Sequence, residues 1–234
     1  MKNIKHGDKD DATKQVTDLQ QQLLKLLFPI DIDGDFGNQT LTALNDFQKW
    51  NNITISNAVD DNVYNAIIAA VEVNNSIDKP SFDRIAKLHP LIRAEVLYLT
   101  KQCYKNNVKI RVVQGLRTFA EQDALYAQGR TKPGPIVTKA KGGFSNHNYG
   151  LSIDFCLLKA DGSISWSQID DADSDGKKDW MEVVAIFQAA GYEWGGLWKF
   201  KDNPHLEKTF GKSIRTLLGL HNAGKVDKNG YVII

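Results

Sequence analysis

One short segment of the chain, residues 151–157, restricts the fold more than any other. It reads LSIDFCL and alternates in character as a half-buried β-strand does. Ser152 and Asp154 therefore share one face of the strand, while Ile153 and Phe155 share the other. Asp154 stands among apolar neighbours, where an unpaired charge is costly. A bound metal ion would offset that cost.

Two histidines are candidates to join Asp154 in a metal site. His147 lies seven residues earlier, the wrong parity for the same strand face, but residues 148–150 (NYG) can supply a bend. His205 comes much later in the chain, and Asp202 precedes it by three residues as a spare carboxylate. Three N/O ligands with an open fourth position are typical of a hydrolytic zinc site. A structural site would more often be closed by cysteines, and the chain has only 2.

Composition excludes several classes of protein. The net charge of the 234 residues is +1 with mixed signs, which gives no electrostatic case for nucleic acid. The sequence has no run of about 18 consecutive apolar residues, so it predicts no membrane span. The amino-terminal residues 1–15 have no apolar core and predict no secretory signal. Cys103 and Cys156 match no disulfide framework, so we expect free thiols in a chain made in a reducing compartment.

The first 71 residues predict a small helical domain. Apolar residues recur at helical spacing over 13–27, over a second segment that Asn38 is expected to cap, and over roughly 61–71. A turn rich in Gly and Asp, residues 31–37 (DIDGDFG), separates the first two helices. The apolar positions of the three helices are Val16, Leu19, Leu23, Leu26 and Leu27, then Leu41, Leu44, Phe47 and Trp50, then Val63, Ile67 and Val71.

Residues 13–71 resemble the small peptidoglycan-binding domain that is attached to many cell-wall hydrolases. The resemblance rests on the order of a leucine-rich helix, the DGDFG turn and the segment TLTALNDFQKWNNI. It implies a three-helix fold and affinity for the bacterial cell wall. That domain usually repeats the DG turn in its second half, and residues 57–61 (NAVDD) depart from this pattern. A helical domain that only packs against its neighbour is the alternative.

A linker is expected at residues 72–80, which are mostly polar and end in a proline, and a second domain at 81–234. This domain opens with a helical region that extends to about Asn106. His89-Pro90 is expected to interrupt that region because proline disfavours helix in the preceding residue. We therefore interpret His89 as a helix-end residue and not as a metal ligand.

Strands and helices follow each other in the second domain. Residues 108–112 and 151–157 alternate as strands do, and 179–190 predicts a helix. Thr118 and Glu121 form a T-x-x-E capping box for another helix. The predicted fold is thus an α+β domain, a small antiparallel sheet with helices packed against it, preceded by the small three-helix domain.

The pattern S-x-H-x-x-G-x-x-x-D at 145–154, followed by D-x-P-H at 202–205, resembles a family of zinc peptidases. That family includes D-alanyl-D-alanine peptidases and the L-alanyl-D-glutamate endopeptidases of phage lysins. The segment GLRT at 115–118 extends the resemblance. LYAQGR at 125–130 and WGG at 194–196 favour the L-alanyl-D-glutamate branch.

The resemblance also implies a role for each site residue. Asp202 would be the general base that takes the proton of a zinc-bound water and passes it to the departing amine, with Glu193 as a competing candidate. Arg117 would stabilise the developing oxyanion or hold the substrate carbonyl. Ser152 and Leu197 depart from the family's usual alanine and aspartate, and neither is a ligand. The predicted site comprises the zinc ligands His147, Asp154 and His205, the catalytic residues Asp202 and Arg117, and Gln122 and Ser145 as substrate-binding or supporting groups.

A second ion site is predicted by an acidic loop. Residues 171–182 satisfy the calcium-loop pattern D-x-D-x-D-G-x5-E, and Asp179 occupies the ninth position. Against calcium, no convincing helix enters the loop, and Lys177 and Lys178 weaken its negative field. A solvated acidic loop is the alternative. The candidate calcium ligands are Asp171, Asp173, Asp175 and Glu182.

Together these features predict a zinc endopeptidase that cuts the L-alanyl-D-glutamate bond of bacterial peptidoglycan. The absence of a signal peptide suits a monomeric phage or prophage endolysin, made in the host cytoplasm and acting on the wall after release. A D-alanyl-D-alanine carboxypeptidase with the same metal machinery is the first alternative. A catalytically silent wall-binding protein is disfavoured because the ligands and the base are all present.

Overall fold

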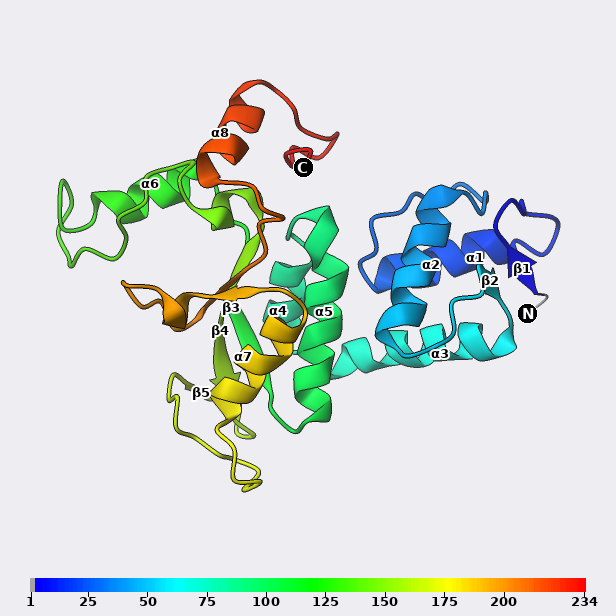
Figure 1. Ribbon diagram of the computed structural model, residues 1–234, viewed down its shortest axis with the longest axis horizontal. Coiled ribbons are helices and arrows are strands. Elements are labelled where there is room, and N and C mark those ends of the chain that lie inside the picture. Colours follow the sequence, from blue (N-terminus) through cyan, green and yellow to red (C-terminus); the bar gives the residue numbers. More distant parts are fainter. Residues whose placement is uncertain (1–2) are drawn as a thin grey trace. The chain divides into compact units, whose positions relative to one another are not determined.

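The computed structural model describes residues 3–234, which form two compact units (Figure 1). The first unit contains the chain up to Asp78 together with Arg93–Lys101, and the second contains Lys79–Ile92 and Gln102–Ile234. The short segment Arg93–Lys101 thus groups with the first unit, although it lies beyond the linker expected at 72–80.

No helix in residues 3–234 has both the length and the apolar character that a membrane crossing requires.

Three helices form most of the first unit, as predicted. Gly37, and not Asn38, is the N-cap of the second helix, and the Asp60 carboxylate caps the third by accepting from the Val63 amide at 2.9 Å. A two-stranded antiparallel sheet, which was not predicted, also belongs to this unit. The elements are β1 (Ile4–Lys5), α1 (Gln15–Lys25), α2 (Asn38–Trp50), β2 (Ala58–Val59) and α3 (Asp61–Glu72).

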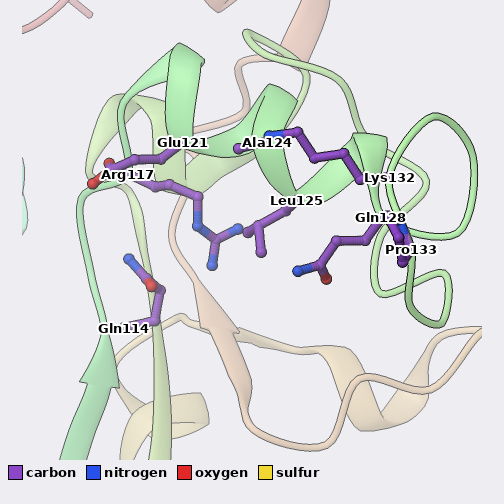
Figure 2. A pocket seen from close by; sticks show the side chains of 8 residues that line it. All are labelled: Gln114, Arg117, Glu121, Ala124, Leu125, Gln128, Lys132 and Pro133. Carbon is purple, nitrogen blue, oxygen red and sulfur yellow. The ribbon is translucent and has the colours of Figure 1, made fainter.

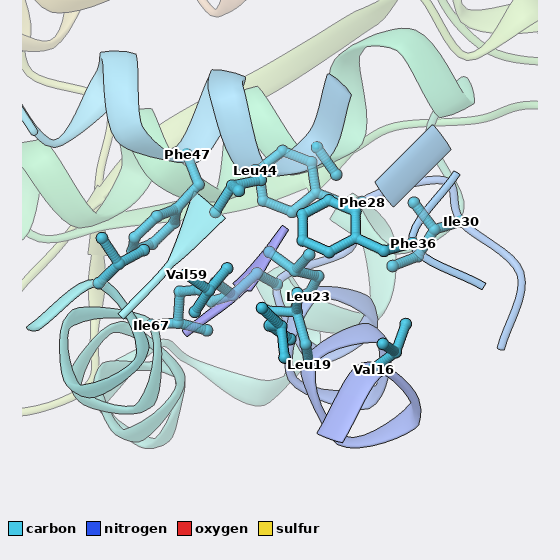
Figure 3. Close-up of a cluster of buried hydrophobic side chains, with 14 of the residues drawn as sticks. Val16, Leu19, Leu23, Phe28, Ile30, Phe36, Leu44, Phe47, Val59 and Ile67 are labelled. Carbon is cyan, nitrogen blue, oxygen red and sulfur yellow. The ribbon is translucent and has the colours of Figure 1, made fainter. Parts of the chain in front are cut away.

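Apolar side chains from all three helices form the core of this unit (Figure 3). Leu19 and Leu23 of α1, Leu44 of α2 and Ile67 of α3 are fully buried. Buried on folding, such side chains each contribute about 1.5–3 kcal/mol. The helical spacing of apolar residues therefore predicted this core correctly.

A buried glutamine fixes the DGDFG turn. The Gln20 side-chain oxygen accepts from the amides of Asp33 and Gly34 at 3.1 and 2.9 Å, and its nitrogen donates to Asp33 at 2.7 Å. Gly34 has φ 71°, a left-handed conformation that favours glycine. The turn thus satisfies its polar groups internally, which explains its Gly and Asp residues without an ion.

The chain from residue 73 to residue 105 is largely helical. The 3-10 helix η1 (Val73–Ser76) is followed by α4 (Lys79–Ile85) and α5 (Pro90–Lys105). His89 is the N-cap of α5, and its ring nitrogen accepts from the Leu91 amide at 3.2 Å. The predicted helix break and the helix-end role of His89 are confirmed.

A five-stranded antiparallel sheet organises the second unit. The strands lie in the order β3-β4-β7-β6, and β5 pairs with β4. Short strands far apart in sequence become neighbours in this order, which brings the two predicted motifs together. The strands are β3 (Ile110–Gln114), β4 (Ser152–Leu158), β5 (Ile164–Ser165), β6 (Glu193–Trp194) and β7 (His205–Glu207).

Helices pack against this sheet and complete the α+β fold. α4 contacts β3, and α7 contacts β4 through rings of Phe155 and Trp180 whose centroids are 4.5 Å apart. Phe155 is therefore on the helix-covered face of β4, and Asp154 is on the opposite face. The sequence did not predict the last helix. The helices that follow β3 in the chain are α6 (Phe119–Ala127), α7 (Asp179–Ala189) and α8 (Ile214–Asn222).

Candidate metal centre

Asp154 and His205 are brought together by strand register. In the antiparallel pair of β4 and β7, Asp154 lies directly opposite His205. Opposite residues in such a pair have neighbouring side chains on the same face. His205 Nδ1 lies 3.1 Å from Asp154 Oδ1. The alternation of the strand thus predicted the correct face for Asp154.

His147 reaches the same carboxylate from a bend before β4. It lies in the 3-10 helix η2 (Asn146–Tyr149), which ends at Gly150 with φ 66°. A Cβ at Gly150 would lie 2.7 Å from the His89 amide nitrogen, so only glycine fits this bend. His147 Nε2 then lies 3.2 Å from Asp154 Oδ1. The predicted bend at 148–150 is confirmed.

Oxygen acceptors behind the two rings set which nitrogens face the centre. His147 Nδ1 lies 2.8 Å from the carbonyl oxygen of Gly115, which can only accept, so Nδ1 carries a proton and Nε2 faces Asp154. His205 Nε2 lies 2.7 Å from Glu207 Oε2, so Nδ1 faces Asp154. Partners of this kind orient histidine ligands in metal sites.

The three residues fit a zinc ion. One ligand atom of each lies within 4.8 Å of the other two, and the two histidines are buried. Zinc bonds of about 2.0–2.1 Å in tetrahedral geometry separate neighbouring ligands by about 3.4 Å. The 3.1 and 3.2 Å separations observed are close to that value. Two imidazoles and one carboxylate leave a fourth position for water, as in hydrolytic sites.

The charges of the centre are strongly coupled. Although burial raises it, hydrogen bonds with His147 and His205 hold the pKa of Asp154 well below its usual range. Glu207, also nearly buried, adds a second carboxylate beyond His205. The centre therefore has the negative character that a divalent cation requires.

Asp202 lies beside the centre because a glycine permits a close approach. The Asp202 amide donates to the Gly195 carbonyl at 3.0 Å, and a Cβ at Gly195 would lie 2.5 Å from the Asp202 carbonyl oxygen. Burial and the charge of Asp154 raise the pKa of Asp202, against the opposing effect of His205 and other nearby cations. A carboxylate with a raised pKa is a better proton acceptor and carrier.

Arg117 lies near the metal centre and is held there by the buried side-chain amide of Gln122. Its backbone amide donates to the His147 carbonyl at 3.0 Å, and its guanidinium donates to Gln122 Oε1 at 2.8 Å. Burial lowers the pKa of Arg117, and the charge of Asp154 acts in the opposite direction. Arginine stays charged in such surroundings.

The structure gives the two weaker candidates supporting positions. Gln122 is fully buried, and its nitrogen donates to the Ala140 carbonyl at 2.9 Å. This burial points to positioning of Arg117 and not to direct contact with substrate. Ser145 is half-buried, and its amide donates to Asn148 Oδ1 at 3.3 Å in the turn that carries His147.

The predicted calcium ligands do not gather as the motif requires. Lys177 binds Asp175 at 2.6 Å and lies 3.8 Å from Glu182. The acidic atoms that lie within 4.8 Å of one another belong to Asp171, Asp173 and Asp179. Asp171 also accepts from two backbone amides of its own turn. The loop is therefore stabilised by its own hydrogen bonds and by Lys177.

Several residues of the site were missed in the sequence. Glu207 orients His205, and the H-x-E spacing on one strand face could have shown it. Trp198 packs against His205 with ring centroids 5.1 Å apart. Its indole nitrogen donates to Glu193, the residue that was the competing candidate for the general base. Gly115 contributes only a carbonyl, which no side-chain pattern can reveal.

The arrangement defines a class, a hydrolytic metal centre with three protein ligands and an adjacent carboxylate. A family model described as D-alanyl-D-alanine carboxypeptidase matches residues 138–208, which contain His147, Asp154, Asp202 and His205. A second model, a putative peptidoglycan binding domain, matches residues 13–67.

Among relatives, the peptidoglycan L-alanyl-D-glutamate endopeptidase CwlK of Bacillus subtilis is 52% identical over 121 residues. The match covers 51% of this chain and 72% of that protein. The chain therefore belongs to the family of metallopeptidases that the first family model and this relative represent. A solved structure, the L-Ala D-Glu endopeptidase ChiX of Serratia marcescens, is 25% identical with a TM-score of 0.39, over 56% of this chain and 87% of that one.

Proposed function

We propose that this chain is a zinc-dependent peptidoglycan endopeptidase that cleaves the bond between L-alanine and D-glutamate in the stem peptide. The observation that carries the proposal is the buried cluster of His147, Asp154 and His205 beside Asp202. The identity of 52% over 121 residues to an L-alanyl-D-glutamate endopeptidase supports the choice of bond.

The residues of the chain divide the chemistry among them. Zinc in such a site supplies Lewis acidity and lowers the pKa of water towards neutrality. The Asp202 carboxylate takes the proton of the attacking water and delivers it to the nitrogen of the departing amine. The Arg117 guanidinium, fixed by Gln122, donates to the carbonyl oxygen as negative charge develops there.

The amino-terminal domain supports peptidoglycan as the substrate. Its match to a peptidoglycan-binding model covers residues 13–67. Binding to the insoluble wall would raise the effective concentration of the catalytic unit at its substrate. Origin from a phage and a route of release to the wall stay predictions of the sequence.

Digestion of purified muropeptides, read by mass spectrometry, tests the proposal. We expect a new free amino terminus on D-glutamate, and no such product from His147→Ala. Release of D-alanine alone would identify a D-alanyl-D-alanine carboxypeptidase instead, the activity in the family model's description. No cleavage of any peptide bond by the zinc-loaded protein would refute both activities.

A further inference from the structure

A groove of about 590 Å³ extends along helix α6 and reaches Arg117 (Figure 2). It is formed by the exposed side of this helix, the end of β3 and the turn that follows the helix. Its lining residues are Gln114, Arg117, Glu121, Ala124, Leu125, Gln128, Lys132 and Pro133.

One end of the groove is formed by Arg117, which lies near the metal centre. The charges of Asp154 and Asp202 both act on the Arg117 guanidinium, and the Arg117 amide is bonded to the His147 carbonyl. A ligand that extends from the metal centre past Arg117 therefore enters the groove.

The charges of the groove favour an anion. Arg117 and Lys132 are cations, and in the described part of the chain Lys132 forms no salt bridge. The one carboxylate, Glu121, already accepts from the Thr118 amide and hydroxyl at 2.8 Å each. These bonds lower the pKa of Glu121 and direct its oxygens to the helix cap.

The turn that carries Lys132 is fixed to the end of α6. The Lys132 amide donates to the Ala127 carbonyl at 2.9 Å, and the Gly129 amide donates to the Lys132 carbonyl at 2.9 Å. Gly129 has φ 69°, and a Cβ there would lie 2.8 Å from Ile136. The cation is thus attached to an ordered backbone, which reduces the entropy lost when a ligand binds.

We propose that this groove is a subsite for a carboxylate of the stem peptide, with Lys132 as the residue that recognises it. The Gln114 and Gln128 amides would pair with peptide groups, and Leu125 would contact methylenes. The inference rests on the proposed function. A γ-linked D-glutamate has a free α-carboxylate next to the scissile bond, and the peptide has a second carboxylate at its C-terminus.

Three synthetic stem peptides test the subsite: the free acid, the D-glutamate α-carboxamide and the C-terminal carboxamide. Each is digested by the zinc-loaded wild type, Lys132→Gln, Lys132→Arg and the exposed control Lys225→Gln. An exposed ion pair supports about a fivefold change in kcat/KM. We expect the wild type to lose about that factor on one of the two amides, mainly through KM, and the affected amide identifies the carboxylate.

Lys132→Gln should lose about the same factor in kcat/KM on the free acid. This variant should cleave the affected amide as fast as it cleaves the free acid. Lys132→Arg and Lys225→Gln should behave as the wild type. Salt should weaken the wild-type preference by screening. Equal cleavage of all three peptides at the L-alanyl-D-glutamate bond by wild type and Lys132→Gln would overturn the subsite and leave the proposed function standing. If the wild type cleaves none of them at that bond, the proposed function fails, and the subsite with it.

Discussion

Glu207 should control the metal affinity of the centre although it is not a ligand. Its Oε2 accepts from His205 Nε2 at 2.7 Å and from Asn146 Nδ2 at 2.8 Å, and its side chain is only 11% exposed. Glu207→Gln keeps an acceptor oxygen but loses the charge, whereas Glu207→Ala loses both. The order of zinc affinity should therefore be wild type, then Gln, then Ala.

The expected loss of zinc affinity follows from the role of Glu207 as the partner that orients His205. Removing such a partner typically costs about 10- to 100-fold in metal affinity, or about 1.4–2.7 kcal/mol. Although burial lowers it, hydrogen bonds to Asp154 and Glu207 raise the pKa of His205 to about 9. Glu207 thus also stabilises the proton that zinc must displace, which partly offsets the gain. We expect about tenfold for Glu207→Gln and more for Glu207→Ala.

Competition with a chromophoric zinc chelator at fixed pH measures this affinity directly. Glu72→Gln, the same change at an exposed helix end, is the matched control and should bind zinc as the wild type does. Circular dichroism verifies that each variant is folded. A folded Glu207→Ala protein with wild-type zinc affinity would show that the reasoning about His205 is wrong.

Four further substitutions separate chemistry from structure. Asp202→Ala should keep zinc and lose at least about 100-fold in kcat/KM, while His147→Ala should lose both zinc and activity. Chelator titration and peptide digestion distinguish the two variants. Loss of zinc from Asp202→Ala would contradict the role of Asp202 as a base. Gly195→Ala places a methyl group 2.5 Å from the Asp202 carbonyl oxygen and should cost about 1–3 kcal/mol of unfolding free energy together with activity. Unchanged urea denaturation and activity would refute that close approach. Thr118→Ala removes the cap of α6 and should cost about 1 kcal/mol in the same denaturation assay, and no loss would show that the capping box is dispensable.

The sequence predicted those parts of the fold whose pattern is local. Helical spacing identified α1 to α3, and the T-x-x-E box identified the start of α6 because a cap depends on residues three apart. The two-residue strands β1 and β2 were missed, since pairs this short have no period to detect. Helix α8 was missed as well, although Leu217 packs against Tyr149 and Leu151 in a cluster of the second unit.

The cluster of His147, Asp154 and His205 could be predicted because its chemistry is unusual for its surroundings. A carboxylate in an apolar strand calls for a partner, and Asp154 had one in His205 across the sheet. The groups that orient these histidines were less visible in the sequence. Glu207 is an ordinary acidic residue until register places it beside His205, and the calcium motif matched in sequence while Lys177 paired with its acids.

The pairing of β4 with β7 has a consequence for how the chain tolerates changes in length. Residues 166–178 form a long connection outside the sheet, between β5 and α7, so insertions or deletions there alter a connection and not the pairing. One residue added between Ser152 and Asp154 would instead move the carboxylate to the helix-covered face. Grafts of loops or whole domains should therefore succeed in the long connection. In the two strands, even a single inserted residue should fail, whatever its type.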